Sequence, residues 1–269
     1  MSAPGERGSP AVAVVPAPRT AEPSSIPALT HASTRWRAHA ASAFRPASSA
    51  SGSAAPRVEH GEVSLHLAPG VRRCEVEPAL PAVDEGDEHL VSVAVRLDHP
   101  SSGRSGRHVL LRWENDGPGS APVDVRVHDG RLVLHGGDGH PSGSRTFTKD
   151  LGHAPEGEWT HLAVRVRFSA NPEKGRVSVR RDGRTVVKDH HPRGGTLYPG
   201  QQSYLKAGLR REAGTSHTAR ATMRDWHVSG VHHSGSRPSG STQHEGHSRS
   251  TGTQQSSSHG HAGARHSRS

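Results

Sequence analysis

The chain has 269 residues, a formal net charge of +9 and only 3% aromatic residues. Its one cysteine, Cys74, excludes an internal disulfide framework, and its apolar runs are all too short to cross a membrane. The positive charge does not indicate a specific nucleic-acid partner, because the sequence has no helical basic region, zinc-finger spacing or aromatic nucleic-acid motif.

Both ends of the chain differ in composition from its middle. Residues 1–57 are rich in Ala, Pro, Ser and Arg, and residues 231–269 are rich in Ser, Gly, His, Arg and Gln. Because neither segment can bury enough apolar surface to offset its chain entropy, we expect a disordered arm and a disordered tail. The remaining span, 58–230, has the size of one domain, which we expect to be a monomer.

The sequence indicates neither an export signal nor a specific metal site. The apolar run at 11–15 is too short for the core of a signal peptide, so the sequence shows no export signal. The tail holds seven of the 23 histidines. A specific metal site needs ligands in a fixed geometry, which a disordered Ser/Gly segment does not supply. We therefore expect neither a metal nor another cofactor.

From residue 62 onward the sequence predicts a succession of short strands separated by clusters of Gly, Pro, Asp and Ser. The predicted strands are 63–67, 71–77, 90–97, 109–113, 123–127, 132–135, 162–168, 177–180, 185–187, 204–209 and 221–228. The clearest is 162–168, where Leu162, Val164 and Val166 alternate with Ala and Arg at a period of two. No amphipathic helix of three turns is visible, so we expect an all-β sandwich or jelly roll.

The same alternation predicts which side chains are interior. We expect a core of Val, Leu and Ala around three tryptophans, Trp113, Trp159 and Trp226, because the domain has few other aromatic residues. The other positions that we assign to the interior are Leu111, Val164, Val166, Leu205 and Leu209. Asp182-Gly183 stands between two extended runs and predicts a hairpin, since Gly accepts the positive φ of the turn.

Three of the predicted strands carry charged residues on the face opposite their apolar one. These residues are Arg73 and Glu75, then Arg112 and Glu114, then Tyr204, Lys206 and Arg210. If the three strands are neighbours in the concave sheet of a jelly roll, their charged faces line a groove suited to a polyanionic ligand. The alternative is a solvated outer sheet, on which charged residues are normal.

In this order and spacing, the segments resemble the heparin lyase I-like polysaccharide lyases, a family that includes glucuronan lyases. The likeness covers about residues 60–230 and rests on Arg73-Cys74-Glu75-Val76, Gly86-Asp87-Glu88, Arg112-Trp113-Glu114, Trp159, Gly175-Arg176-Val177, Asp182-Gly183 and the run at 204–211. It implies a concanavalin-like β-jelly roll, β-elimination on uronic-acid polysaccharides, and secretion. The part at 159–183 is similar to lectin and laminin-G sandwiches as well, so it supports the fold more than the function.

The resemblance also assigns site residues. β-Elimination needs a group that neutralises the uronate carboxylate, a base and an acid. The family typically reads Gln-Trp-His on the middle strand and Tyr-Phe-Lys-Phe-Gly-Ile-Tyr-Arg on the late strand. It therefore implies catalytic positions at Lys206, Tyr204 and Glu114, and substrate-binding positions at Arg73, Glu75, Arg112, Lys206 and Arg210.

At three of these positions the chain departs from the family. Arg112 replaces its Gln, Glu114 its His and Arg210 its last Tyr, whereas Lys206 and Tyr204 match. Because a guanidinium stays protonated at any working pH, Arg210 cannot act as a base.

Three functions remain open from the sequence. The first is a catalytically degenerate lyase-like domain that binds acidic polysaccharide, either uronic-acid or sulfated, through its Arg and Lys side chains. The second is an active lyase with relocated chemistry, in which Tyr204 or a nearby histidine such as His108 is the base. The third is a lectin- or laminin-G-like interaction module without lyase chemistry.

Overall fold

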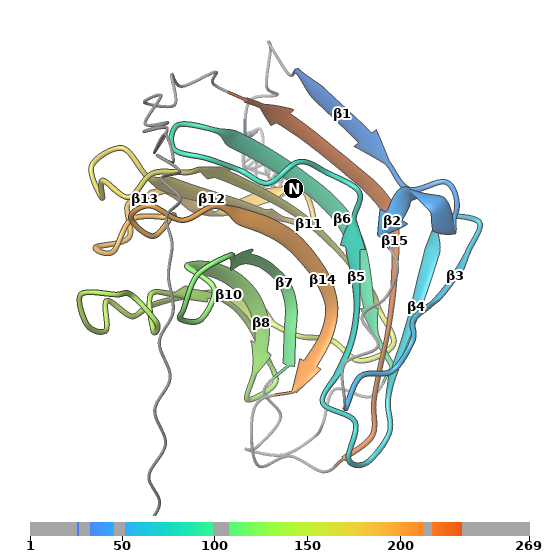
Figure 1. The fold of residues 1–269 in the computed structure, drawn as a ribbon. Helices are drawn as coiled ribbons and strands as arrows, with labels where there is room; N and C mark the ends of the chain where they lie inside the picture. Colours follow the sequence, from blue (N-terminus) through green and yellow to red (C-terminus); the bar gives the residue numbers. More distant parts are fainter. Residues whose placement is uncertain (1–25, 27–32, 46–51, 99–107, 212–216, 233–269) are drawn as a thin grey trace, which may run out of the picture. The chain divides into compact units, whose positions relative to one another are not determined.

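The computed structural model describes residues 26, 33–45, 52–98, 108–211 and 217–232. These residues form two antiparallel sheets packed as a sandwich (Figure 1). Their one helical segment is a 3-10 turn, η1 (Ala41–Ala43), and no helix among them is long and apolar enough to span a membrane. The predicted all-β jelly-roll sandwich is confirmed.

The larger sheet has eight strands. Its order is β13 (Arg184–His190), β12 (Arg176–Arg181), β11 (Trp159–Arg167), β6 (Glu88–Leu97), β15 (Ala219–Val231), β4 (Glu62–Leu67) and β3 (Arg57–Glu59), with β1 (Thr34–Arg37) also paired to β15. The smaller sheet has seven strands. Its order is β10 (Phe147–His153), β9 (Arg131–Gly136), β8 (Val123–His128), β7 (His108–Asn115), β14 (Ser203–Arg211), β5 (Arg73–Pro78) and β2 (Phe44–Arg45).

All eleven predicted strands are present, as β4 to β9 and β11 to β15. The alternation of apolar and polar residues marked them because each has one face on the core. Strand β10 was missed because it lies at a sheet edge and buries only Leu151. Strand β3, also at an edge, buries none of its three residues.

The predicted start of the folded domain at residue 58 is too late. Within the segment that the sequence assigned to a disordered arm, β1 pairs with β15 and β2 pairs with β5. The reason is an aromatic cluster: the rings of Trp36 and Phe44 lie 6.5 and 5.8 Å from the ring of Trp226. Two such rings bury much apolar surface without any strand periodicity. Residues 1–25, 27–32 and 46–51 of the arm, and the tail from residue 233, lie outside the described residues.

The core lies between the sheets and is mostly aliphatic, as predicted. Trp113, Leu111, Val164, Val166, Leu205, Leu209 and Trp226 are all buried. The prediction for Trp159 is wrong, because its side chain is partly exposed. Alternation along β11 turns Leu162 and Val164 inward and Trp159 outward. There the indole is covered by the guanidinium groups of Arg224, at 3.9 Å from the ring centroid, and Arg96, at 5.0 Å.

We expect Trp159→Ala to lower the free energy of unfolding by only about 1–2 kcal/mol. The substitution removes two cation–π contacts, each of about 0.5–1 kcal/mol at an exposed site, and leaves no core cavity. Trp113→Ala is the control, because Trp113 is fully buried and its truncation should cost about 3–5 kcal/mol. Urea titration of both variants is the measurement. Equal losses would place the Trp159 ring in the core.

Candidate functional site

The three charged strands are neighbours in the smaller sheet, in the order β7, β14, β5 (Figure 1). Their pairing sets Lys206 opposite Arg112, Tyr204 opposite Glu114, and Arg210 opposite Arg73. Residues directly opposite each other point to the same side of a sheet. The structure therefore brings all the sequence-predicted site residues together. We call this surface the charged face: Arg73, Glu75, Arg112, Glu114, Tyr204, Lys206 and Arg210.

Arg112 is the centre of an ion-pair network on the charged face. Its Nε lies 3.1 Å from Oε1 of Glu75, its Nη2 lies 3.2 Å from Oε2 of the same carboxylate, and Nη2 also contacts Glu114. Arg112 is only 4% exposed. Its guanidinium is thus paired with two carboxylates. Arg112 is buried and positions these two carboxylates. It is not the accessible anion contact that the sequence suggested.

The more accessible cations stand around this network. The side chain of Arg210 is 42% exposed, and its Nη1 lies 3.7 Å from Oε1 of Glu114. Lys206 is less exposed, and its Nζ lies 3.9 Å from Oε2 of Glu77. Arg73 is partly exposed beside them. A ligand approaching the charged face therefore meets Arg73, Lys206 and Arg210 before it meets Arg112.

Burial sets the protonation of two groups on this face. It raises the pKa of the Glu75 carboxyl, against the opposing effect of the Arg112 guanidinium. Burial also raises the pKa of the Tyr204 hydroxyl, and the negative charge of Glu114 adds to the effect. The ammonium of Lys206 lies 5.0 Å from the centre of the Tyr204 ring. Tyr204 therefore keeps its proton at neutral pH and is suited to donate a hydrogen bond.

The charged face extends onto β8 and β9, which the sequence analysis missed. Arg112 lies opposite Asp124, which lies opposite His135 in turn. Arg126 holds Asp124 through both carboxylate oxygens, with Nε 2.7 Å from Oδ1, and His135 Nε2 lies 3.3 Å from Oδ2 of Asp138. The sequence could have predicted this part of the face, because Asp124 and Arg126 alternate with buried valines along β8.

His108, the histidine suggested as a base, does not belong to the charged face. It lies opposite Val127, a core residue, and opposite Arg211. Burial, with a smaller effect of Arg211, lowers the pKa of His108 to about 4. The strand alternation that sets Arg210 outward sets Arg211 and His108 on the other side. Among the described residues, no group of three or more His, Cys, Asp or Glu side chains is arranged to hold a metal ion.

Comparisons with known proteins agree with this fold. The solved structure of alginate lyase A1-II', a member of polysaccharide lyase family 7, is similar at 18% identity and a TM-score of 0.51, covering 64% of this chain and 81% of that one. Alginate lyase AlyC3 is similar at 14% identity and a TM-score of 0.50, covering 63% and 75%. At such identities the likeness shows a shared fold alone.

Comparison of the sequence with family models shows more than a shared fold. No curated protein sequence matches the chain. A family model for polysaccharide lyases, however, matches residues 30–226, which is well over half of the 269 residues. The resemblance inferred from the motifs is confirmed at this level, and the chain belongs to the polysaccharide lyase family.

Proposed function

We propose that the domain binds acidic polysaccharide, uronic-acid or sulfated, on the charged face, and that it performs little or no elimination. In this proposal it is a divergent member of the heparin lyase I-like and glucuronan lyase-like group. The observation that carries the proposal is the adjacency of β5, β14 and β7, which gathers Arg73, Lys206 and Arg210 on one surface.

The accessible cations support anion binding. Guanidinium groups form paired hydrogen bonds with carboxylate and sulfate, which favours Arg73 and Arg210 as ligand contacts. Lys206, further along β14, adds a point charge at the position that the resembling lyases also fill with Lys. The acidic residues Glu75 and Glu114 both form ion pairs with Arg112, so they oppose an incoming anion less than free carboxylates do.

The same face is poorly equipped for proton abstraction. The raised pKa of Tyr204 disfavours the phenolate that a base requires. Glu114 lies between Arg112 and Arg210, so taking up a proton would weaken two ion pairs. Arg210 itself stays protonated. None of these three residues is suited to remove the C5 proton of a uronate.

An active lyase is the second candidate, and the Tyr204–Lys206 contact favours it. A lysine ammonium close to a tyrosine ring stabilises the phenolate form of that tyrosine. The ammonium of Lys206 lies 5.0 Å from the centre of the Tyr204 ring. Absorbance of the new double bond during incubation with polyuronates separates the two candidates. A sustained increase in that absorbance with the unmodified protein would contradict the proposal that the domain performs little or no elimination. A glycan array without any binding would favour the interaction module instead.

We expect Lys206→Gln/Arg210→Gln to weaken binding of a polyuronate or heparin by about 100-fold, since each lost charged contact contributes about 1.5 kcal/mol or more. Isothermal titration at low salt is the measurement, because such contacts are screened by salt. The matched control is Arg184→Gln/Lys188→Gln on β13, whose side chains are exposed on the larger sheet. Equal affinity of both double variants would remove the charged face as the binding site.

A further inference from the structure

A polar pocket of about 720 Å³ lies on the larger sheet, away from the charged face. Three segments far apart in the sequence line it: residues 37–39 at the end of β1, the β3–β4 turn at 59–62, and residues 224–227 of β15. Ligand sites in proteins typically have volumes of about 300–1,000 Å³. The pocket is therefore large enough for one or two sugar units.

An interruption in the sheet creates this pocket. Along one edge of β15, the ladder with β4 ends at Met223 and the ladder with β1 begins at His227. Between them the strand bulges away from β6, and Asp225 takes a positive φ of 57°. The β3–β4 turn closes the far side: a Cβ on Gly61 would lie 2.6 Å from the carbonyl oxygen of Ala38. The opening is thus built into the backbone.

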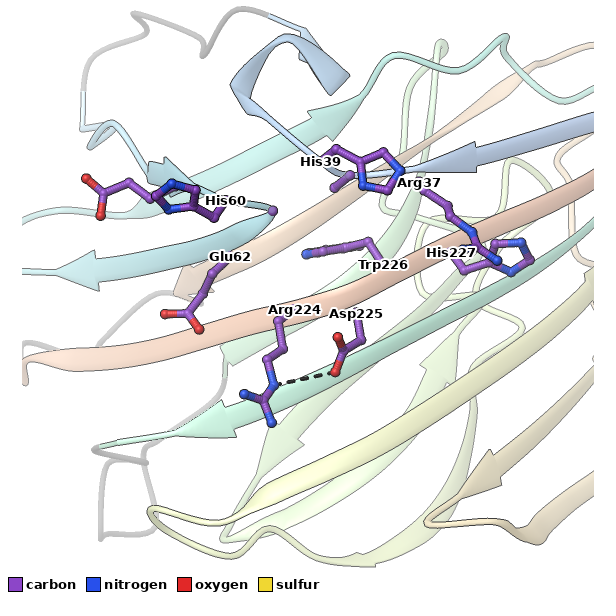
Figure 2. A pocket seen from close by; sticks show the side chains of 11 residues that line it. Arg37, His39, His60, Glu62, Arg224, Asp225, Trp226 and His227 are labelled. Atoms are coloured by element: carbon purple, nitrogen blue, oxygen red, sulfur yellow. Dashed lines mark ion pairs between the residues drawn. The ribbon is translucent and has the colours of Figure 1, made fainter.

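The lining offers hydrogen-bond donors and acceptors side by side. Figure 2 shows Arg37, His39, His60, Glu62 and Trp226 around one space. Within the described part of the chain, Arg37 and Glu62 have no ion-pair partner. By contrast, Asp225 pairs with Arg224 at 3.4 Å, and Glu59 with Arg57 at 2.6 Å.

Trp226 forms part of the wall of this pocket. Its side chain is 97% buried, since its exposure is 3%, and its indole N–H has no hydrogen-bond partner among the described residues. The neighbouring Trp36 is different, because its indole N–H donates to the carbonyl of Ala43 at 3.1 Å. Buried polar groups in folded proteins nearly always have a partner. The indole nitrogen of Trp226 is itself closed off from the pocket, so a bound molecule would meet the edge of the ring and not its N–H group.

The chemistry of the lining selects among ligand classes. An inorganic anion would meet three carboxylates, Glu59, Glu62 and Asp225, at the same site. An apolar ligand would bury charged groups without replacing their hydrogen bonds with water. Sugar hydroxyls both donate and accept, so they match guanidinium, imidazole and carboxylate groups together. We propose that this pocket binds a neutral pyranose unit of a glycan, independently of the charged face.

The test uses the full chain and ligand-observed NMR with methyl glycosides of glucose, galactose, mannose and xylose, and with inorganic phosphate as a separate arm. We expect saturable binding of at least one glycoside. Arg37→Gln and Glu62→Gln should each weaken it by about tenfold, because each removes one charged hydrogen bond.

The control Lys206→Gln/Arg210→Gln alters only the charged face and should leave glycoside binding unchanged. Arg37 and Glu62 are exposed, so their substitution leaves the core of the domain intact. Three results would overturn the proposal: no glycoside binds the unmodified protein, the pocket variants bind as it does, or phosphate alone binds. Loss of polyuronate binding in the control, with glycoside binding retained, shows two separate sites.

Discussion

Acidification from pH 7 to pH 4 should lower the stability of the domain by roughly 6 kcal/mol through two buried histidines. Burial is the main reason that the pKa values of His89 and His108 fall from about 6.5 to about 4. A shift of this size corresponds to about 3 kcal/mol for each group. Below pH 6.5 the unfolded chain binds protons that the folded chain refuses, so stability is full above that pH and is lost as the pH falls toward 4.

The surroundings of His89 explain why it stays neutral. It is 1% exposed, its Nδ1 accepts from the indole N–H of Trp113 at 3.5 Å, and its ring meets Phe168 edge-on at 5.6 Å. The charge of His232 lowers the pKa of His89 further, while Asp87 acts in the opposite direction. Protonation at Nδ1 would also break the bond from Trp113, which couples the charge of His89 to the centre of the core.

Urea titrations between pH 7 and pH 4.5 measure this effect. His89→Gln keeps an acceptor for Trp113 but cannot be protonated, so its stability should fall about half as steeply with pH. The double variant with His108→Gln should fall less steeply still. His161→Gln is the control, because His161 is exposed on β11. A double variant with the same pH slope as the unmodified protein would show that neither histidine is responsible.

The sequence predicted the sandwich because its strands repeat at a period of two, and that signal depends only on one buried face. It did not predict β1 and β2, because these strands are held in place by contacts with residues that are distant in the sequence. The hydroxyl of Ser33, for example, donates to the carbonyl of Gly230, 197 residues away. Edge strands such as β10 were missed for a related reason: with little core to cover, they need no alternation.

The candidate site was predictable in its membership but not in its internal pairing. Alternation sets Arg112, Glu114 and Lys206 on one face once the strands are known. It does not reveal that Arg112 lies under Glu75 and Glu114, because that depends on which strands are neighbours and on their register. The pocket on the larger sheet could not be predicted from the sequence. Its lining comes from residues 37–39, 59–62 and 224–227, which are far apart in the chain.

Arg112→Gln restores the residue that the resembling lyases carry, yet we expect it to destabilise this chain by about 3–5 kcal/mol at pH 8. Glu75 is buried, with 9% of its side chain exposed, and Glu114 lies on the other side of the same guanidinium. Removing one partner of a buried ion pair leaves an uncompensated charge. Here it leaves two carboxylates facing each other without the cation between them.

The pH dependence of this loss identifies its cause. Without Arg112 the pKa of the Glu75 carboxyl, already raised by burial, should rise further. A carboxyl with a raised folded-state pKa contributes stability below its unfolded pKa and loses it as the pH rises. The deficit of Arg112→Gln relative to the unmodified protein should therefore be largest at pH 8 and shrink by pH 5, opposite in sign to the histidine effect.

Arg112→Gln/Glu75→Gln is the matched control, because it removes the charges of both partners and keeps the size of the Glu75 side chain. We expect it to recover most of the lost stability at pH 8 and to show little pH dependence of its own. If the single and double variants were equally unstable, the guanidinium would matter for its packing and not for its charge. If the charge is responsible, Arg112 and Glu114 form one unit: the guanidinium at the family's Gln position is needed because carboxylates stand on both sides of it.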